Sequence, residues 1–249
     1  MTMPVLFLGH GSPMNAIEDN PFTRGWEEIA GSIPRPKAIL SVSAHWYGVG
    51  TKTSDTLEPK QIYDMGGFPE ELYHLSYPCP GSKELAGRVM ELLGSTVSID
   101  NRWGIDHGTW SVLVKMYPEG DIPVVQLSID ANKSPMEHLA LGRLLAPLRE
   151  EGILILGSGN VVHNLRLVDW TMDHGAPWAD AFDGRIRDLI LAGNHEGVAG
   201  EAQGPAVPTP DHYLPLLYVL GATKVGEKVR VYNEARILGS LSMTSYLIG

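Results

Sequence analysis

The chain of 249 residues has a formal net charge of -10 at pH 7 and no cluster of Lys and Arg, which argues against a nucleic-acid partner. No apolar run approaches the roughly 18–20 residues that span a membrane, and no cationic region precedes the apolar N-terminal residues, so we expect neither a membrane span nor a signal peptide. The single cysteine, Cys79, rules out an internal disulfide and any CxxC motif, which favours a cytoplasmic protein.

Length and patterning together predict one domain. Roughly 100–200 residues per domain is the usual range. No Ser/Gly-rich linker, charge block, internal repeat or low-complexity tract divides the chain. We therefore expect residues 1–249 to form a single domain.

The first 93 residues contain two predicted strands and one predicted helix. Residues 5–8 and 38–42 are short, continuous apolar runs, which are typical of strands buried on both faces. Residues 85–93 carry apolar side chains at i, i+4, i+7 and i+8, which predicts a helix with one buried face.

The middle of the chain repeats this alternation. Residues 123–129 are rich in β-branched side chains and predict a strand. Ser134 as N-cap, Pro135 at the first helical position and Glu137 three residues after the cap predict a helix start. Pro147 should kink that helix or end it early, and a buried strand follows at residues 153–156.

The last third predicts helices at residues 178–191 and 213–220, with further strand at 229–232 and 237–247. Strands that alternate with helices indicate an α/β sandwich, with a largely parallel or mixed central sheet and helices on both faces.

Four histidines lie beside Gly, Ser, Pro or Asn where an apolar segment ends: His10, His45, His163 and His212. Ligands in α/β sheets bind beyond the carboxyl ends of the strands, and imidazole is a common ligand of transition metals. His10 and His45 each follow a predicted strand, and His163 follows one after a Gly-rich turn. These three therefore predict a metal centre, whereas His212 has equal claims as a ligand and as part of a helix cap.

Other polar residues are weaker candidates. His107, between Trp103 and Trp110, is placed either to contact an aromatic ligand or to fill a packed loop. Glu234 is a rival third ligand, because two histidines and one carboxylate form the usual non-haem Fe(II) site. We expect the remaining histidines to be structural or exposed, and no HExxH, GxSxG, GxGxxG or P-loop motif occurs.

Five segments together resemble the class III, LigB-type extradiol ring-cleavage dioxygenases, and within them the 4,5-DOPA extradiol dioxygenase branch. They occur in order along nearly the whole chain: HGSP at 10–13, SAHW at 43–46, WGIDHGTW at 103–110, GSGNVVHN at 157–164 and TPDHYLPL at 209–216.

The resemblance implies a LigB-like catalytic domain over residues 1–249 with one metal ion. It implies that His10, His45 and His212 are ligands, that His163 is the acid/base residue and a candidate fourth ligand, and that His107 contacts the substrate. Turnover would require Fe(II), although Zn2+ would also occupy a histidine site readily. A catechol such as L-DOPA would react with O2 to give a muconic semialdehyde, with His163 moving protons at a pKa near neutrality.

Two other functions fit the same histidines. A zinc hydrolase would use them to activate water, although no glutamate base is evident beside them. A non-catalytic metal-binding protein would be indicated if all four histidines saturated the ion, because catalysis needs an open coordination position. The physiological catechol, the ring bond that is cut and the oligomeric state remain open at this point.

Overall fold

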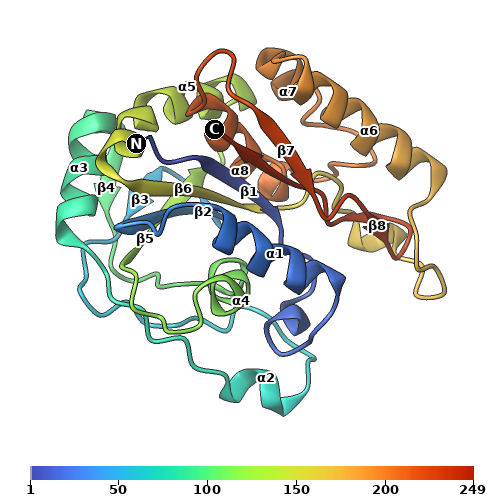
Figure 1. Cartoon of the computed structure of the whole chain (residues 1–249), viewed down its shortest axis with the longest axis horizontal. Coiled ribbons are helices and arrows are strands. Elements are labelled where there is room, and N and C mark those ends of the chain that lie inside the picture. The colour runs from blue at the N-terminus through green and yellow to red at the C-terminus, as the bar shows by residue number, and fades with distance from the viewer. Residues whose placement is uncertain (1) are drawn as a thin grey trace.

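The computed structural model describes residues 2–249, whose strands form an eight-stranded mixed sheet and a separate two-stranded ribbon (Figure 1). The order across the large sheet is β4-β3-β5-β2-β6-β1-β10-β7, and the ribbon pairs β8 with β9. The strands are β1 (Val5–Gly9), β2 (Ala38–Gly48), β3 (Thr51–Thr53), β4 (Val97–Ile99), β5 (Val124–Asp130), β6 (Ile153–Gly159), β7 (Val229–Tyr232), β8 (Arg236–Ile237), β9 (Leu241–Ser242) and β10 (Ser245–Ile248).

The centre of the large sheet is parallel and its flanks are mixed. Strands β5, β2, β6 and β1 run parallel to one another, whereas β10 is antiparallel to both β1 and β7. The register pairs Gly9 with Gly159 and Ser43 with Ser158. The carboxyl ends of β1 and β6 and the segment of β2 that precedes His45 therefore meet at one place.

Helices cover both faces of this sheet, as the sequence predicts (Figure 1). Alternate residues of β1 show why its apolar run is continuous: Val5 and Phe7 enter one core cluster and Leu6 and Leu8 the other. The helices are α1 (Pro21–Ser32), α2 (Glu70–His74), α3 (Lys83–Leu93), α4 (His107–Met116), α5 (Pro135–Leu145), α6 (Pro177–Leu191), α7 (His195–Gly200) and α8 (Leu214–Gly221).

Local sequence signals account for the start and end of α5. The Ser134 hydroxyl accepts a hydrogen bond from the backbone N–H of Glu137, and the Glu137 carboxylate accepts one from the backbone N–H of Ser134, which completes the predicted capping box. The α-helix ends at Leu145, two residues before Pro147, and continues as a 3-10 turn, Ala146–Glu151. The prediction that Pro147 ends the helix early is confirmed.

Two expected strands differ from the observed ones. β2 extends to Gly48, so His45 lies within a strand rather than after one, and the pairing with β5 jumps from Val42 to Tyr47. The expected strand at 237–247 is three short strands, because Leu238 and Gly239 both adopt positive φ, 51° and 73°, and turn the chain.

The helix that carries His107 was not foreseen from periodicity. Most of α4 is buried, so it has no polar face to create a helical pattern. Its N-cap is Asp106, whose carboxylate accepts from the backbone N–H of Thr109. Across residues 2–249, no helix combines the length and the apolar character needed to cross a membrane.

Candidate metal centre

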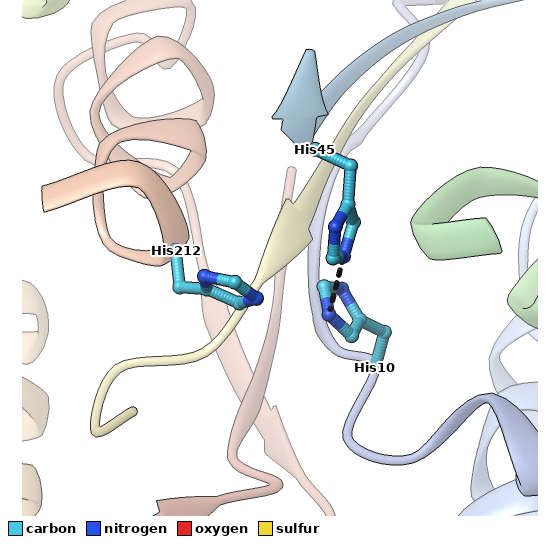
Figure 2. A group of neighbouring side chains, drawn as sticks. All are labelled: His10, His45 and His212. Atoms are coloured by element: carbon cyan, nitrogen blue, oxygen red, sulfur yellow. Dashed lines mark hydrogen bonds between the residues drawn. The ribbon is translucent and has the colours of Figure 1, made fainter. Parts of the chain in front are cut away.

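Three of the predicted histidines converge at the carboxyl ends of the central strands. His10 directly follows β1, His45 lies in β2, and His212 ends the 3-10 turn η5 (Pro210–His212). One ring nitrogen from each lies within 4.8 Å of the others, and Figure 2 shows the three rings directed toward a common space. The Nε2 atoms of His10 and His45 are 3.3 Å apart.

An irregularity in β2 directs His45 toward this space. Residues 43–46 lie between the pairs Val42–Leu127 and Tyr47–Ile129, so the ladder with β5 is interrupted there. Such bulges re-aim side chains and are frequent beside active sites.

Close packing against two glycines, which a larger residue would not permit, completes the arrangement. A Cβ on Gly159 would lie 2.1 Å from the carbonyl oxygen of His212, and a Cβ on Gly108 would lie 2.7 Å from Cδ2 of His45. Side chains at these two positions would push His212 and His45 out of place.

The hydrogen-bond partners of His10 fix its tautomer. Ser158 donates its hydroxyl proton to the carbonyl oxygen of Gly108, so the same hydroxyl must accept from Nδ1 of His10, 2.9 Å away. The proton of His10 is therefore on Nδ1, which leaves the Nε2 lone pair free.

Carboxylates play the same part for the other two histidines. Asp211 Oδ2 lies 2.6 Å from Nδ1 of His212, and Asp64 Oδ2 lies 3.3 Å from Nδ1 of His45. A carboxylate only accepts hydrogen bonds, so His212, which bonds to Asp211, carries its proton on Nδ1 and presents Nε2 to the common space. The charge of Asp64 beside Nδ1 of His45 favours the same tautomer for His45.

This donor set fits a metal ion. The Nε2 atoms of His10 and His45 face each other at 3.3 Å, close enough to share a proton or a cation. With both rings protonated on Nδ1, their two lone pairs would repel unless a cation lay between them. Neighbouring imidazole nitrogens on a tetrahedral ion with bonds of 2.0–2.1 Å are about 3.3–3.4 Å apart, which matches this separation. Imidazole nitrogens suit both zinc and iron.

Burial favours the neutral form of His10 and His45. His10 and His212 are 2% and 7% exposed. Burial, followed by the neighbouring histidines, lowers the pKa of His10 and of His45 well below the ordinary value. A neutral ring is the form that binds a metal, because protonation would occupy the donor nitrogen.

His163 lies against the cluster in a different orientation. Its ring stacks on that of His212, with centroids 3.5 Å apart and planes within 4° of parallel. Two stacked rings cannot both direct an in-plane lone pair at one ion. Burial and the neighbouring His212 lower the pKa of His163 to about 3, well below the near-neutral value that the family resemblance implies.

His107 completes the histidine group from the first turn of α4. Its ring centroid lies 3.8 Å from that of His45 and 6.0 Å from that of His10, and the side chain is 6% exposed. Among the aromatic residues nearby in the sequence motifs, Trp46 stacks on Trp103, with ring centroids 6.0 Å apart. Trp110 and Tyr213 are fully buried and belong to the core.

The rival ligand Glu234 is placed elsewhere. It forms an ion pair with Arg187 and is 41% exposed, and it belongs to neither of the two groups of ligand atoms found among residues 2–249. The other histidines match their structural or exposed assignment, since His138 is fully buried against Tyr218 and His74 is 70% exposed.

The sequence interpretation missed the partners that orient the histidines. Asp211 could have been found, because it directly precedes His212 in a Pro-Asp-His turn. Ser158 and Asp64 gave no such signal, because each reaches its histidine across the fold, from 148 residues away in the case of Ser158.

Comparisons with known proteins extend over nearly the whole chain. The family described as the catalytic LigB subunit of aromatic ring-opening dioxygenase matches residues 4–244. A protein of Escherichia coli named 4,5-DOPA dioxygenase extradiol is 49% identical, covering 99% of this chain and 95% of that protein. A protein of the same name from Beta vulgaris is 39% identical, with 96% and 94% covered.

A solved structure shows the same fold. The crystal structure of an uncharacterized protein from Escherichia coli matches with a TM-score of 0.84 and 44% sequence identity. The match covers 99% of this chain and 100% of that chain, so neither contains a large region that the other lacks.

Proposed function

The chain belongs to the LigB family of aromatic ring-opening dioxygenases, in its 4,5-DOPA branch, and on that premise we propose that it cleaves the ring of a catechol such as L-DOPA. As an extradiol dioxygenase it uses O2, and the proposed product is a muconic semialdehyde. We also propose that residues 1–249 work as one catalytic domain in the cytoplasm, with a small aromatic substrate as partner.

The observation that carries this proposal is the convergence of three histidines whose ring nitrogens lie within 4.8 Å of one another. His10, His45 and His212 would hold Fe(II) for turnover, and the same nitrogens would accept Zn2+. A bound Fe(II) would supply adjacent coordination positions for the catechol oxygens and O2, which replaces an encounter of separate molecules.

In this proposal His163 is the general acid/base that carries out the proton transfers. Its low pKa leaves the ring neutral at pH 7, so it can accept the proton of a catechol hydroxyl on a ring nitrogen. The stacked orientation keeps its lone pair out of the ligand set, so we assign it as acid/base and not as a fourth ligand. The negative charge of a bound catecholate would raise its pKa and help it to hold the proton until it is returned.

His107 is the second residue that we propose acts on the substrate. It lies beside His45 with its ring buried, so a donor from this ring would hydrogen-bond to a substrate bound next to the ligand group. A hydrogen bond of this kind orients the substrate without adding a ligand to the metal.

The experiment that tests the function is anaerobic reconstitution of the purified protein with Fe(II), followed by L-DOPA and air. We expect oxygen uptake together with a visible-absorbing ring-cleavage product. His45→Ala should abolish both, whereas His74→Ala, on an exposed residue, should leave both unchanged. Stoichiometric iron with no product from L-DOPA or simple catechols would refute the ring-cleavage assignment, and ester hydrolysis by the Zn-loaded protein would then favour a hydrolase.

A further inference from the structure

Asp64 lies at the end of an extended segment that is fixed on its neighbours. The backbone N–H of Ile62 donates to the carbonyl oxygen of Ile105 at 2.8 Å, and that of Ile105 donates to the carbonyl oxygen of Lys60 at 2.8 Å. The indole N–H of Trp110 also donates to the carbonyl oxygen of Ile62, at 2.8 Å. These bonds hold the backbone before Asp64 against the segment that leads into α4.

The carboxylate of Asp64 reaches two histidines at once. Its Oδ1 accepts from the backbone N–H of His107 at 2.9 Å. Its Oδ2 lies 3.0 Å from Nδ1 of His107 and 3.3 Å from Nδ1 of His45. The side chain is 13% exposed, so water screens these contacts weakly. For His107 Nδ1 the contact is close but off the N–H axis, so it is electrostatic rather than an aligned hydrogen bond.

We infer that Asp64 is a positioning residue that sets the tautomer and aim of His45 and His107 together, so that metal affinity and substrate contact depend on one carboxylate. The inference rests on the proposed roles of His45 as a ligand and His107 as a substrate contact.

The chemistry of the carboxylate explains why a close isostere should not replace it. Asp64 offers lone pairs to both Nδ1–H groups and to the backbone N–H of His107. Asparagine has one acceptor oxygen, so its NH2 group would face one of these donors. A ring facing that NH2 group would shift its proton from Nδ1 to Nε2, and His45 in that tautomer has no lone pair for a metal.

Asp211 provides the matched comparison. It lies 2.6 Å from Nδ1 of His212 and serves that one ring, as part of the turn that precedes it. Asp211→Asn should therefore weaken metal binding without disturbing His107. Asp64→Asn should do both.

The test measures Zn2+ affinity by chelator competition, with no catechol present. We expect dissociation constants about 10–100-fold higher for Asp64→Asn and for Asp211→Asn, the usual effect of removing a partner that orients a ligand histidine. Asp19→Asn, on a side chain 78% exposed and paired with Arg24, should match the unmodified protein. Unchanged affinity in Asp64→Asn would overturn the inference.

Two further readouts separate positioning from mere structural support. Long-range 15N–1H spectra of the Zn-loaded protein should show Nδ1–H on His45 and His107, and Asp64→Asn should convert at least one of them to Nε2–H. At saturating Fe(II), Asp211→Asn should recover more of the kcat/KM for L-DOPA than Asp64→Asn, which should stay at least about tenfold low because His107 remains misplaced. Equal recovery of both variants would contradict the link to His107.

One alternative role of the same group is decided by stoichiometry. His45, Asp64 and His107 also present ligand atoms within 4.8 Å of one another. Binding of two Zn2+ ions to the unmodified protein and one to Asp64→Asn would make Asp64 a ligand and refute a positioning role. If the melting temperature shows that Asp64→Asn does not fold, Asp64→Ser, which keeps an acceptor for the His107 backbone, replaces it in the same measurements.

Discussion

The histidine cluster and the buried pair of His138 and Tyr218 are two regions that both contain buried histidines, but only the cluster has the arrangement of a metal site. His138 is fully buried in α5, and burial lowers its pKa to about 4. Its Nδ1 lies 2.9 Å from the hydroxyl of Tyr218 in α8, and its Nε2 has no polar partner. Burial and a low pKa are thus common to both regions.

The two regions differ in whether several histidine rings converge on one space. At the sheet edge, each candidate ligand histidine has an acceptor beside Nδ1, and its ring is directed at the same space as its neighbours. His138 instead bonds to the phenol of Tyr218, and this bond ties α5 to α8. A single histidine with a shifted pKa is therefore weak evidence for a functional site. Several histidines whose rings are directed at one space are strong evidence.

The largest expected effect is a loss of activity on substitution in the histidine cluster, compared with a loss of stability alone on substitution of His138. His45→Ala should lower kcat/KM by about 10⁴-fold, or about 5.4 kcal/mol, because the metal is lost with its ligand. His138→Leu should keep metal affinity and activity while lowering the free energy of unfolding by about 1–3 kcal/mol, because the Tyr218 hydroxyl loses its partner.

Metal analysis, steady-state kinetics and urea unfolding of both variants check this pair. Loss of metal from His138→Leu, at a temperature where the protein is folded, would show that the two regions are not independent.

The second-largest expected effect is a loss of turnover on substitution of His163, within the histidine cluster. His163→Ala should lower kcat by about 10²–10⁴-fold, the usual contribution of a general acid/base, with stoichiometric metal retained. The measurement is single-turnover ring cleavage by iron-loaded protein of known metal content. Metal loss in parallel with activity would instead make His163 a ligand, and full turnover would remove it from the mechanism.

The same contrast shows which features a sequence can reveal. Apolar runs fixed by burial on both faces, such as 5–8 and 153–156, predicted β1 and β6, because a strand covered by helices on both faces is mostly apolar. The capping box at Ser134 predicted the start of α5 from local chemistry alone.

Features that depend on tertiary contacts were not predictable. The α4 helix is buried nearly all round and has no amphipathic pattern. The extension of β2 through His45 depends on its pairing with β5 and β6, and Asp64 acts on histidines that are distant along the chain. The histidines at the strand ends were recognisable because the topology of a parallel sheet places them together.

A third effect tests how tightly the cluster is packed. Gly108→Ala would bring a Cβ to 2.7 Å from both His45 Cδ2 and Ser43 Oγ, so His45 must move. We expect metal affinity to fall about tenfold, as for other disturbed ligand supports.

Gly87→Ala in α3 is the matched control, because no atom lies within 4 Å of its added Cβ. It should raise the free energy of unfolding by roughly 0.5–1 kcal/mol through helix propensity and leave metal affinity unchanged. Equal metal affinities in the two alanine variants would show that His45 tolerates displacement.

The smallest effect is the pH dependence of stability from His138 alone. The pKa of His138 is lowered to about 4 in the folded protein, against about 6.5 in the unfolded chain. Between these values the unfolded chain binds a proton that the folded protein does not, so stability falls as the pH falls, by up to about 1.4 kcal/mol per unit. His138→Gln should flatten the pH dependence by that amount.

Urea unfolding at about pH 7, 6 and 5, with chelator present, measures the slope. Zn2+ should steepen the dependence, because its ligands must be deprotonated, but the difference between the two proteins should stay the same. A difference that vanished on adding Zn2+ would mean that His138 titrates with the cluster, and the distinction between the two regions would fail.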